Sequence, residues 1–168
     1  MKKLCLIFLC MLYVAEVASV PLKEEKTFKD WSVFSTMRLY TPDTCYALST
    51  PYRTRALTRL RNLPFIVVKY VGGGKFTLSA TSGFILSTEY GLIIEIGDRS
   101  HRLVGGSNEF TWTSSYLQDR AILEDMLDGE EYLKVRSFSH HNDSVLDYYS
   151  LLGLKDALTY MERNCVGS

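Results

Sequence analysis

The sequence predicts an all-β protein: a single-domain antiparallel β-sandwich or barrel with one short internal helix and a C-terminal helix. Short runs of β-branched and aromatic residues recur along most of the chain, and Gly, Asn and Asp separate them. Two later segments break this rhythm with apolar residues at helical spacing. Roughly seven or eight strands at such short spacing are typical of two packed sheets or of one closed sheet.

The composition is that of a folded domain without a charge bias. The 168 residues include 19 Lys and Arg against 19 Asp and Glu, with 46% hydrophobic residues and 4 Pro. This profile excludes a disordered or collagen-like chain. The chain also has no block of basic residues, so we expect no nucleic acid among its partners, because proteins that bind nucleic acid neutralise phosphates with clustered Lys and Arg.

The N-terminus has the pattern of a secretory signal peptide. Lys2 and Lys3 precede an apolar run over residues 4–14, and small residues lead to a cleavage position at Ser19. The apolar run is shorter than the roughly 20 residues that a membrane-spanning helix needs. We therefore expect residues 1–19 to be removed, leaving an exported mature chain without a transmembrane segment.

The mature chain is expected to begin with a polar lead-in over residues 20–29, followed by one β domain over residues 30–168. The strand-like runs of this domain are residues 31–34, 45–48, 65–71, 75–80, 92–96, 110–112, 131–138 and 145–149. Apolar and polar residues alternate clearly in two of them: Leu133 and Val135, for example, oppose Lys134 and Arg136. Strands of this kind have one face in the core and one face in water.

Two segments are expected to be helical. Ser114 or Ser115 can cap a helix over about residues 117–128, and Gly129 supplies its end. The second helix presents apolar residues at helical spacing: Leu151, Leu154, Leu158, Met161 and Cys165. This pattern places Cys165 toward the core.

Removal of the signal peptide would leave two cysteines, Cys45 and Cys165. In an oxidising compartment they can form one intramolecular disulfide, which would tie the C-terminal helix to the strand that begins at Cys45. Closing a loop of about 120 residues would stabilise the fold by roughly 4–5 kcal/mol in the chain-entropy model. The alternative is a pair of unbridged buried thiols.

Six segments in register carry a family resemblance. They are Asp30-Trp-Ser-Val-Phe34, Cys45-Tyr-Ala-Leu-Ser-Thr-Pro51, Phe110-Thr-Trp112, Met126-Leu-Asp-Gly129, Asp147-Tyr-Tyr-Ser-Leu-Leu-Gly153 and the final Cys165. In order and spacing they resemble the invasion-associated locus B (IalB) family, whose members are exported proteins of Gram-negative bacteria, mostly alphaproteobacteria. The founding member of that family is associated with entry of a pathogen into host cells.

The resemblance implies an exported envelope or virulence-associated interaction protein that is periplasmic, outer-membrane-associated or secreted. Its partner would be a protein or a component of the envelope or of the host surface. Many relatives carry a further cysteine shortly after the tryptophan, where this chain has Phe34-Ser-Thr-Met37, so any second bridge of the family is absent. The family transfers no catalytic residue to this chain.

An enzymatic alternative would use His140, His141 and Asp143, with His101, because imidazoles and a carboxylate can bind zinc or transfer protons. Adjacent residues on a strand project to opposite faces, so His140 and His141 would not readily share one metal. We therefore expect no catalytic residue, no metal site and no cofactor. A hydrolase or periplasmic metal-binding protein, and a purely structural envelope protein, are the alternative functions.

A local concentration of positive charge is the best candidate for a binding site. It consists of Arg53, Arg55, Arg59 and Arg61, with no acidic residue between them. An exposed patch of this kind can bind an anionic envelope lipid or a host-surface polymer. The alternative is a solvated loop whose charges meet Asp and Glu elsewhere on a neutral surface.

Overall fold

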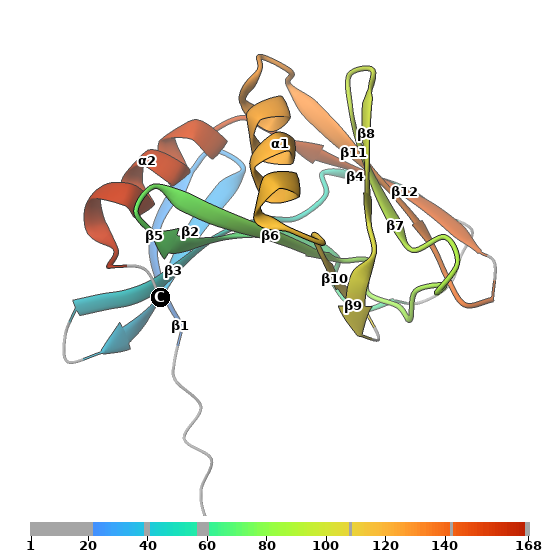
Figure 1. Cartoon of the computed structure of the whole chain (residues 1–168), viewed down its shortest axis with the longest axis horizontal. Coiled ribbons are helices and arrows are strands. Elements are labelled where there is room, and N and C mark those ends of the chain that lie inside the picture. The colour runs from blue at the N-terminus through green and yellow to red at the C-terminus, as the bar shows by residue number, and fades with distance from the viewer. Residues whose placement is uncertain (1–21, 39–40, 57–60, 108, 142, 167–168) are drawn as a thin grey trace, which may run out of the picture.

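The computed structural model forms two antiparallel sheets and two helices (Figure 1). It describes residues 22–38, 41–56, 61–107, 109–141 and 143–166. The strands of the larger sheet are β1 (Leu22–Phe28), β2 (Trp31–Arg38), β3 (Thr41–Ser49), β5 (Phe65–Gly72), β6 (Lys75–Thr81), β9 (Gly105–Ser107) and β10 (Phe110–Trp112). The strands of the smaller sheet are β4 (Arg53–Ala56), β7 (Leu92–Ile96), β8 (Arg99–Leu103), β11 (Tyr132–Phe138) and β12 (Ser144–Ser150). The helices are α1 (Tyr116–Leu127) and α2 (Leu154–Asn164).

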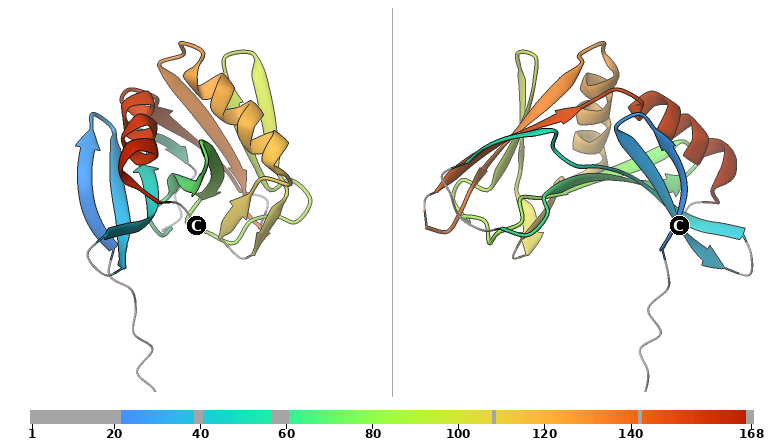
Figure 2. Two further views of the ribbon diagram at one scale, coloured as in Figure 1. Left: turned by 60° about the vertical axis from the view of Figure 1, so that its left-hand side comes forward. Right: turned by 180° about the vertical axis from the view of Figure 1, so that it is seen from behind.

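The strand order is β1-β2-β3-β5-β6-β10-β9 in the seven-stranded sheet and β4-β12-β11-β7-β8 in the five-stranded sheet. The all-β prediction is therefore confirmed, and of its two architectures the described strands show two separate sheets, as in a sandwich. Helix α2 packs on β1, β2, β3 and β5, whereas α1 packs beside β6, between α2 and the smaller sheet (Figures 1 and 2). Neither helix of the described part of the chain has the length and apolar character needed to cross a lipid bilayer.

One hydrophobic core lies between these elements. Buried side chains come from both sheets and both helices: Trp31, Ile66, Leu78, Leu92, Ile94, Leu133, Ile122, Met126, Leu154 and Met161. The predicted alternation is confirmed on β11, where Leu133 and Val135 are buried, while Lys134 and Arg136 lie on the opposite face. The two faces of each sheet therefore have different chemistry, which positions the candidate site.

Strands β1, β4, β8 and β9 were not predicted from the sequence. Strand β1 occupies most of the segment expected to be a polar lead-in, residues 20–29, and pairs with β2. Strands β1, β4, β8 and β9 are all end strands of their sheets, and β1, β4 and β8 are largely polar. Edge strands form through backbone pairing on one side only and do not need an apolar face, so the hydrophobic pattern does not reveal them.

The ends of the helices follow from local chemistry. The Ser115 side chain accepts a hydrogen bond from the backbone N–H of Gln118, which confirms the predicted cap of α1. Helix α2 begins at Leu154, later than Leu151, because Gly153 adopts the left-handed conformation with φ of 94°. A Cβ at Gly153 would lie 1.9 Å from the Phe28 carbonyl oxygen, so only glycine fits there.

The structure contains the disulfide between Cys45 of β3 and Cys165, the residue that follows α2. Their Cα atoms lie 6.1 Å apart across a sequence separation of 120 residues. The bond therefore fixes the end of α2 to the middle of the larger sheet.

Candidate functional site

The structure divides the four arginines of the candidate patch. Arg53 and Arg55 lie on β4 and are exposed. Arg61 lies in the connection to β5, and only 12% of its side chain is exposed. Arg59 lies outside the described residues. The cluster that is continuous in sequence is therefore not one surface in space.

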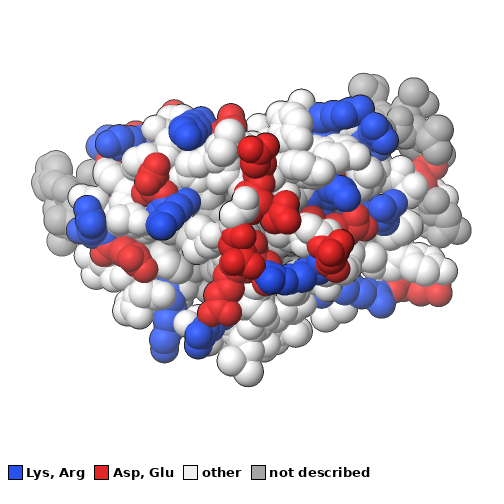
Figure 3. All heavy atoms as spheres, turned by 90° about the horizontal axis from the view of Figure 1, so that it is seen from above, with Lys and Arg blue, Asp and Glu red and all other residues white. Residues whose placement is uncertain are grey.

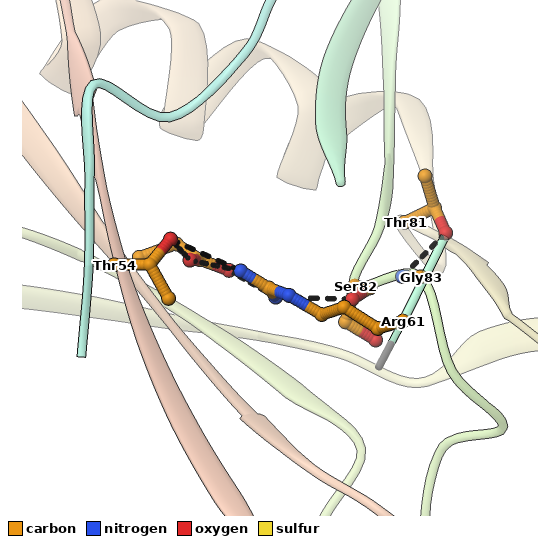
Figure 4. A network of polar contacts seen from close by, with 6 residues as sticks. Thr54, Arg61, Thr81, Ser82 and Gly83 are labelled. Atoms are coloured by element: carbon orange, nitrogen blue, oxygen red, sulfur yellow. Dashed lines mark hydrogen bonds and ion pairs between the residues drawn. The ribbon is translucent and has the colours of Figure 1, made fainter. Parts of the chain in front are cut away.

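Arg61 forms a buried bidentate ion pair with Asp147. Figure 4 shows Arg61 lying between Thr54 and Ser82. Arg61 Nη1 and Nη2 donate to Oδ2 and Oδ1 of the Asp147 carboxylate over 2.7 and 2.6 Å. Nη1 also donates to the Ser82 carbonyl at 3.1 Å, and the Thr54 hydroxyl donates to Asp147 Oδ1 at 2.6 Å. The Asp147 side chain is fully buried, so the guanidinium supplies the compensation that a buried carboxylate requires.

This network joins three separate parts of the chain. Thr54 and Asp147 are paired residues of β4 and β12 in the smaller sheet, whereas Ser82 follows β6 of the larger sheet. Gly83, next to Ser82, has φ of 77°, and a Cβ there would lie 2.0 Å from the Asn62 carbonyl oxygen. The chain around Arg61 is thus closely packed, and its guanidinium is already engaged within the protein.

The pKa of the Tyr149 phenol is shifted by the same buried environment. Burial raises the pKa of Tyr149 far above its ordinary value, and the charge of Asp147 raises it further, while Arg61 acts in the opposite direction. Tyr149 therefore stays protonated as part of the core.

The outward residues of the same strands form a different site. Strand parity places Thr54 and Asp147 on one face of the strand pair, so their neighbours Arg53 and Tyr148, which pair with each other, lie on the opposite face. The Cζ atoms of Arg53 and Arg55 lie 5.5 and 5.8 Å from the centre of the Tyr148 ring. Such cation–π contacts hold the two guanidiniums on the sheet while their N–H groups stay available to a ligand.

Further cations continue this surface across the sheet. On β11, Lys134 lies opposite Tyr148, and Arg136 lies opposite Leu146. On β8, Arg102 lies opposite Ile93 of β7. We call the outer surface formed by five residues the basic face: Arg53, Arg55, Arg102, Lys134 and Arg136. Among the outward residues of these strands, the one carboxylate is Glu95, which accepts a hydrogen bond from Arg136 at 3.0 Å.

Acidic residues gather elsewhere on the molecule. Viewed from above, they form a stripe across the middle, with Lys and Arg on both sides (Figure 3). Asp125 of α1 and Asp128, which follows that helix, accept hydrogen bonds from Arg99 of β8. The chain is neutral overall, but its charges are separated in space, which allows a local positive potential on the basic face.

The histidines are not brought together as a metal site. The rings of His140 and His141 lie 3.7 Å apart at an exposed turn, and the Ser139 hydroxyl accepts hydrogen bonds from the backbone N–H groups of His141 and Asp143. His101 lies 2.6 Å from Asp125 of α1 instead. Within the described ranges, no three His, Cys, Asp or Glu residues are arranged to hold a metal ion.

The segments that carry the family resemblance have structural roles here. Trp31 is fully buried, and its indole N–H donates to the Ser150 carbonyl at 3.0 Å, which connects the two sheets. Asp147 pairs with Arg61, and Gly153 allows the left-handed start of α2. These residues therefore stabilise the fold of this chain, and the basic face is built largely from other residues.

Sequence reasoning missed Lys134, Arg136, Arg102 and Tyr148 as members of the site. The alternation over residues 131–138 did place Lys134 and Arg136 on one wet face. What it did not show was that β4 pairs with β12, which brings Arg53 and Arg55 beside this face.

The arrangement of the elements is similar to that of a solved protein. The crystal structure of invasion associated protein B from Bartonella henselae matches this chain with a TM-score of 0.56 and 12% sequence identity, covering 81% of this chain and 92% of that chain. At this identity the likeness shows a shared fold. No family model matches the sequence, and no curated protein matches it.

Proposed function

We propose that this chain is an exported, non-enzymatic interaction protein related to the IalB family, which acts at the bacterial envelope or at a host-cell surface. The basic face is the surface through which it binds an anionic component. The observation that carries this proposal is the arrangement of Arg53 and Arg55 over Tyr148, beside Lys134 and Arg136. Guanidiniums that are already ordered lose less conformational freedom when they bind an anion.

Two further observations support export and an envelope role. A disulfide is typical of proteins that fold in an oxidising compartment, and the pair here closes a long loop. The shared fold with an invasion-associated protein supports a related role at the envelope or in virulence. We propose no catalytic group and no cofactor.

The test is binding of the disulfide-bonded mature chain, residues 20–168, to defined anionic surfaces. Vesicles with and without phosphatidylglycerol, and a sulfated polysaccharide matrix, would be compared at low and physiological salt. We expect salt-sensitive binding that falls at least about tenfold in the double variant Arg53→Ser/Arg55→Ser, because both guanidiniums donate to the anion. Lys155→Ser/Arg163→Ser is the matched control, since these exposed cations lie on α2. Equal loss in the control, or no loss in the arginine variant, would contradict the assignment of the basic face.

A further inference from the structure

A hollow lined by tyrosines and carboxylates lies at one end of the basic face. Its volume is about 250 Å³, and it is lined by Asp30, Tyr52, Glu131, Tyr132, Ser150 and Leu152. We call it the tyrosine hollow. It lies outside the arginine network and contains none of the histidines considered above.

The walls of the tyrosine hollow stand on either side of β12. The backbone N–H of Tyr52 donates to the Tyr148 carbonyl at 3.0 Å on one side, and Tyr132 is paired with Ser150 on the other. Their ring centres lie 6.4 and 6.1 Å from the centre of the Tyr148 ring. Tyr52 is 60% exposed and Tyr132 is 41% exposed, so both rings are accessible to a ligand.

The two rings that line the hollow, Tyr52 and Tyr132, suit a compact cation. The Tyr52 and Tyr132 rings are inclined to Tyr148 by 58° and 45°. Both rings thus pack at an angle against Tyr148, which lies between them on β12 and does not line the hollow. A quaternary ammonium is bound by the electron-rich faces of aromatic rings at about 6 Å or less. The carboxylates of Asp30 and Glu131 add negative charge to the same hollow.

The neighbouring arginines restrict the ligand further. The Arg53 guanidinium lies 5.5 Å from the centre of the Tyr148 ring, so a lone cation in the hollow would meet a nearby positive charge. A ligand that places an anion between its cation and Arg53 removes this repulsion. The site is therefore complementary to a zwitterion with an ammonium group at one end and a phosphate at the other.

We propose that the tyrosine hollow and the adjacent arginines bind the phosphocholine headgroup of phosphatidylcholine at a membrane surface. The trimethylammonium group lies between Tyr52 and Tyr132, and the phosphate accepts hydrogen bonds from Arg53 and Arg55. Leu152, which lines the hollow and is 47% exposed, and the exposed Tyr52 ring suit the interfacial region of a bilayer. The proposal rests on the proposed function in one respect: the partner is a surface component.

The test is flotation of the disulfide-bonded chain with phosphatidylcholine vesicles, at physiological salt. We expect binding that soluble phosphocholine displaces, while choline chloride or inorganic phosphate alone displaces it at least about tenfold less well, because each occupies only half of the site. Tyr52→Ala/Tyr132→Ala should reduce binding at least about tenfold. Tyr52→Phe/Tyr132→Phe, which keeps both rings, should retain it. Tyr116→Ala removes an exposed tyrosine from α1 and is the matched control.

Three results would overturn the proposal. They are absence of binding to phosphatidylcholine, displacement by a neutral sugar instead of phosphocholine, and equal binding by the wild type and the alanine variant with unchanged thermal unfolding. Loss of phosphatidylcholine binding with retained, arginine-dependent binding to phosphatidylglycerol would reject only this inference. Absence of binding to every surface tested would reject the proposed function as well.

Discussion

The two faces of the β4–β12 strand pair hold arginine side chains in opposite environments. On the inner face, Arg61 is fixed to Asp147 by two short hydrogen bonds and is almost completely shielded from water. On the outer face, Arg53 and Arg55 contact the ring of Tyr148 and are exposed. Within β4, Thr54 thus belongs to a structural network, whereas Arg53 and Arg55 belong to a candidate binding surface, and strand parity separates the two roles.

The difference has an energetic consequence. Breaking a buried ion pair leaves an uncompensated charge in the protein, which typically costs about 3–5 kcal/mol. An exposed cation–π contact is worth only about 0.5–1 kcal/mol. Changes on the inner face should therefore affect stability, whereas changes on the outer face should affect binding.

The largest effect is expected from Asp147→Ala, which leaves Arg61 without its carboxylate. We expect the free energy of unfolding to fall by about 3–5 kcal/mol, measured by urea denaturation. Asp98→Ala, an exposed acid in the turn between β7 and β8, is the control and should change stability by less than about 0.5 kcal/mol. A variant in which Arg61 and Asp147 are both apolar should recover much of the loss; a similar cost for Asp147→Ala and the control would show that the pair is not structural.

A smaller effect is expected from Thr54→Val, which keeps the shape of the side chain but removes its hydroxyl. Asp147 would lose a hydrogen bond of 2.6 Å, so we expect a loss of about 1–2 kcal/mol in the free energy of unfolding. Because Thr54 and Arg61 act on the same carboxylate, the effects of Thr54→Val and Asp147→Ala should not add. Additive losses, measured in the double variant by the same urea titration, would contradict a shared network.

On the outer face, Arg53→Ser/Arg55→Ser should change the free energy of unfolding by no more than about 1 kcal/mol, because only exposed ring contacts are lost. The same variant should lose anion binding, so stability and binding should separate. If the midpoint of thermal unfolding fell as far as it does in Asp147→Ala, these arginines would be needed for the stability of the fold.

The smallest expected effect is that of salt concentration, which should differ between the two faces. Raising the ionic strength from about 0.1 to 1 M shortens the Debye length from about 10 to 3 Å, which weakens binding through exposed charges. The stability that depends on Arg61 should change little, because that ion pair is shielded from solvent. We expect the cost of Asp147→Ala to be nearly equal at both salt concentrations; a cost that disappears in high salt would place the pair in a solvent-accessible setting.

The sequence predicted the central parts of the fold and little of the site. Strands with alternating or continuous apolar residues, such as β11 and β7, were found because burial imposes those patterns. The pairing of β4 with β12 was not predictable, because residues 53–56 have no apolar face and their partner lies about ninety residues further along the chain. Arg61 and Arg53 looked equivalent in sequence, since charge alone does not show which one meets a buried carboxylate.

The position of β4 also constrains the order in which the chain can fold. Strands β1, β2, β3, β5 and β6 lie in the larger sheet in nearly their sequence order, so neighbouring segments can pair early. Strand β4 can pair only with β12, and Arg61 can form its ion pair only with Asp147, and both partners are synthesised much later. A chain interrupted before residue 147 would carry an unpaired strand and an unneutralised arginine at the place where the second sheet should close. Such a chain would be a substrate for proteolysis or edge-to-edge aggregation, and a nascent chain would share that exposure until β12 is added.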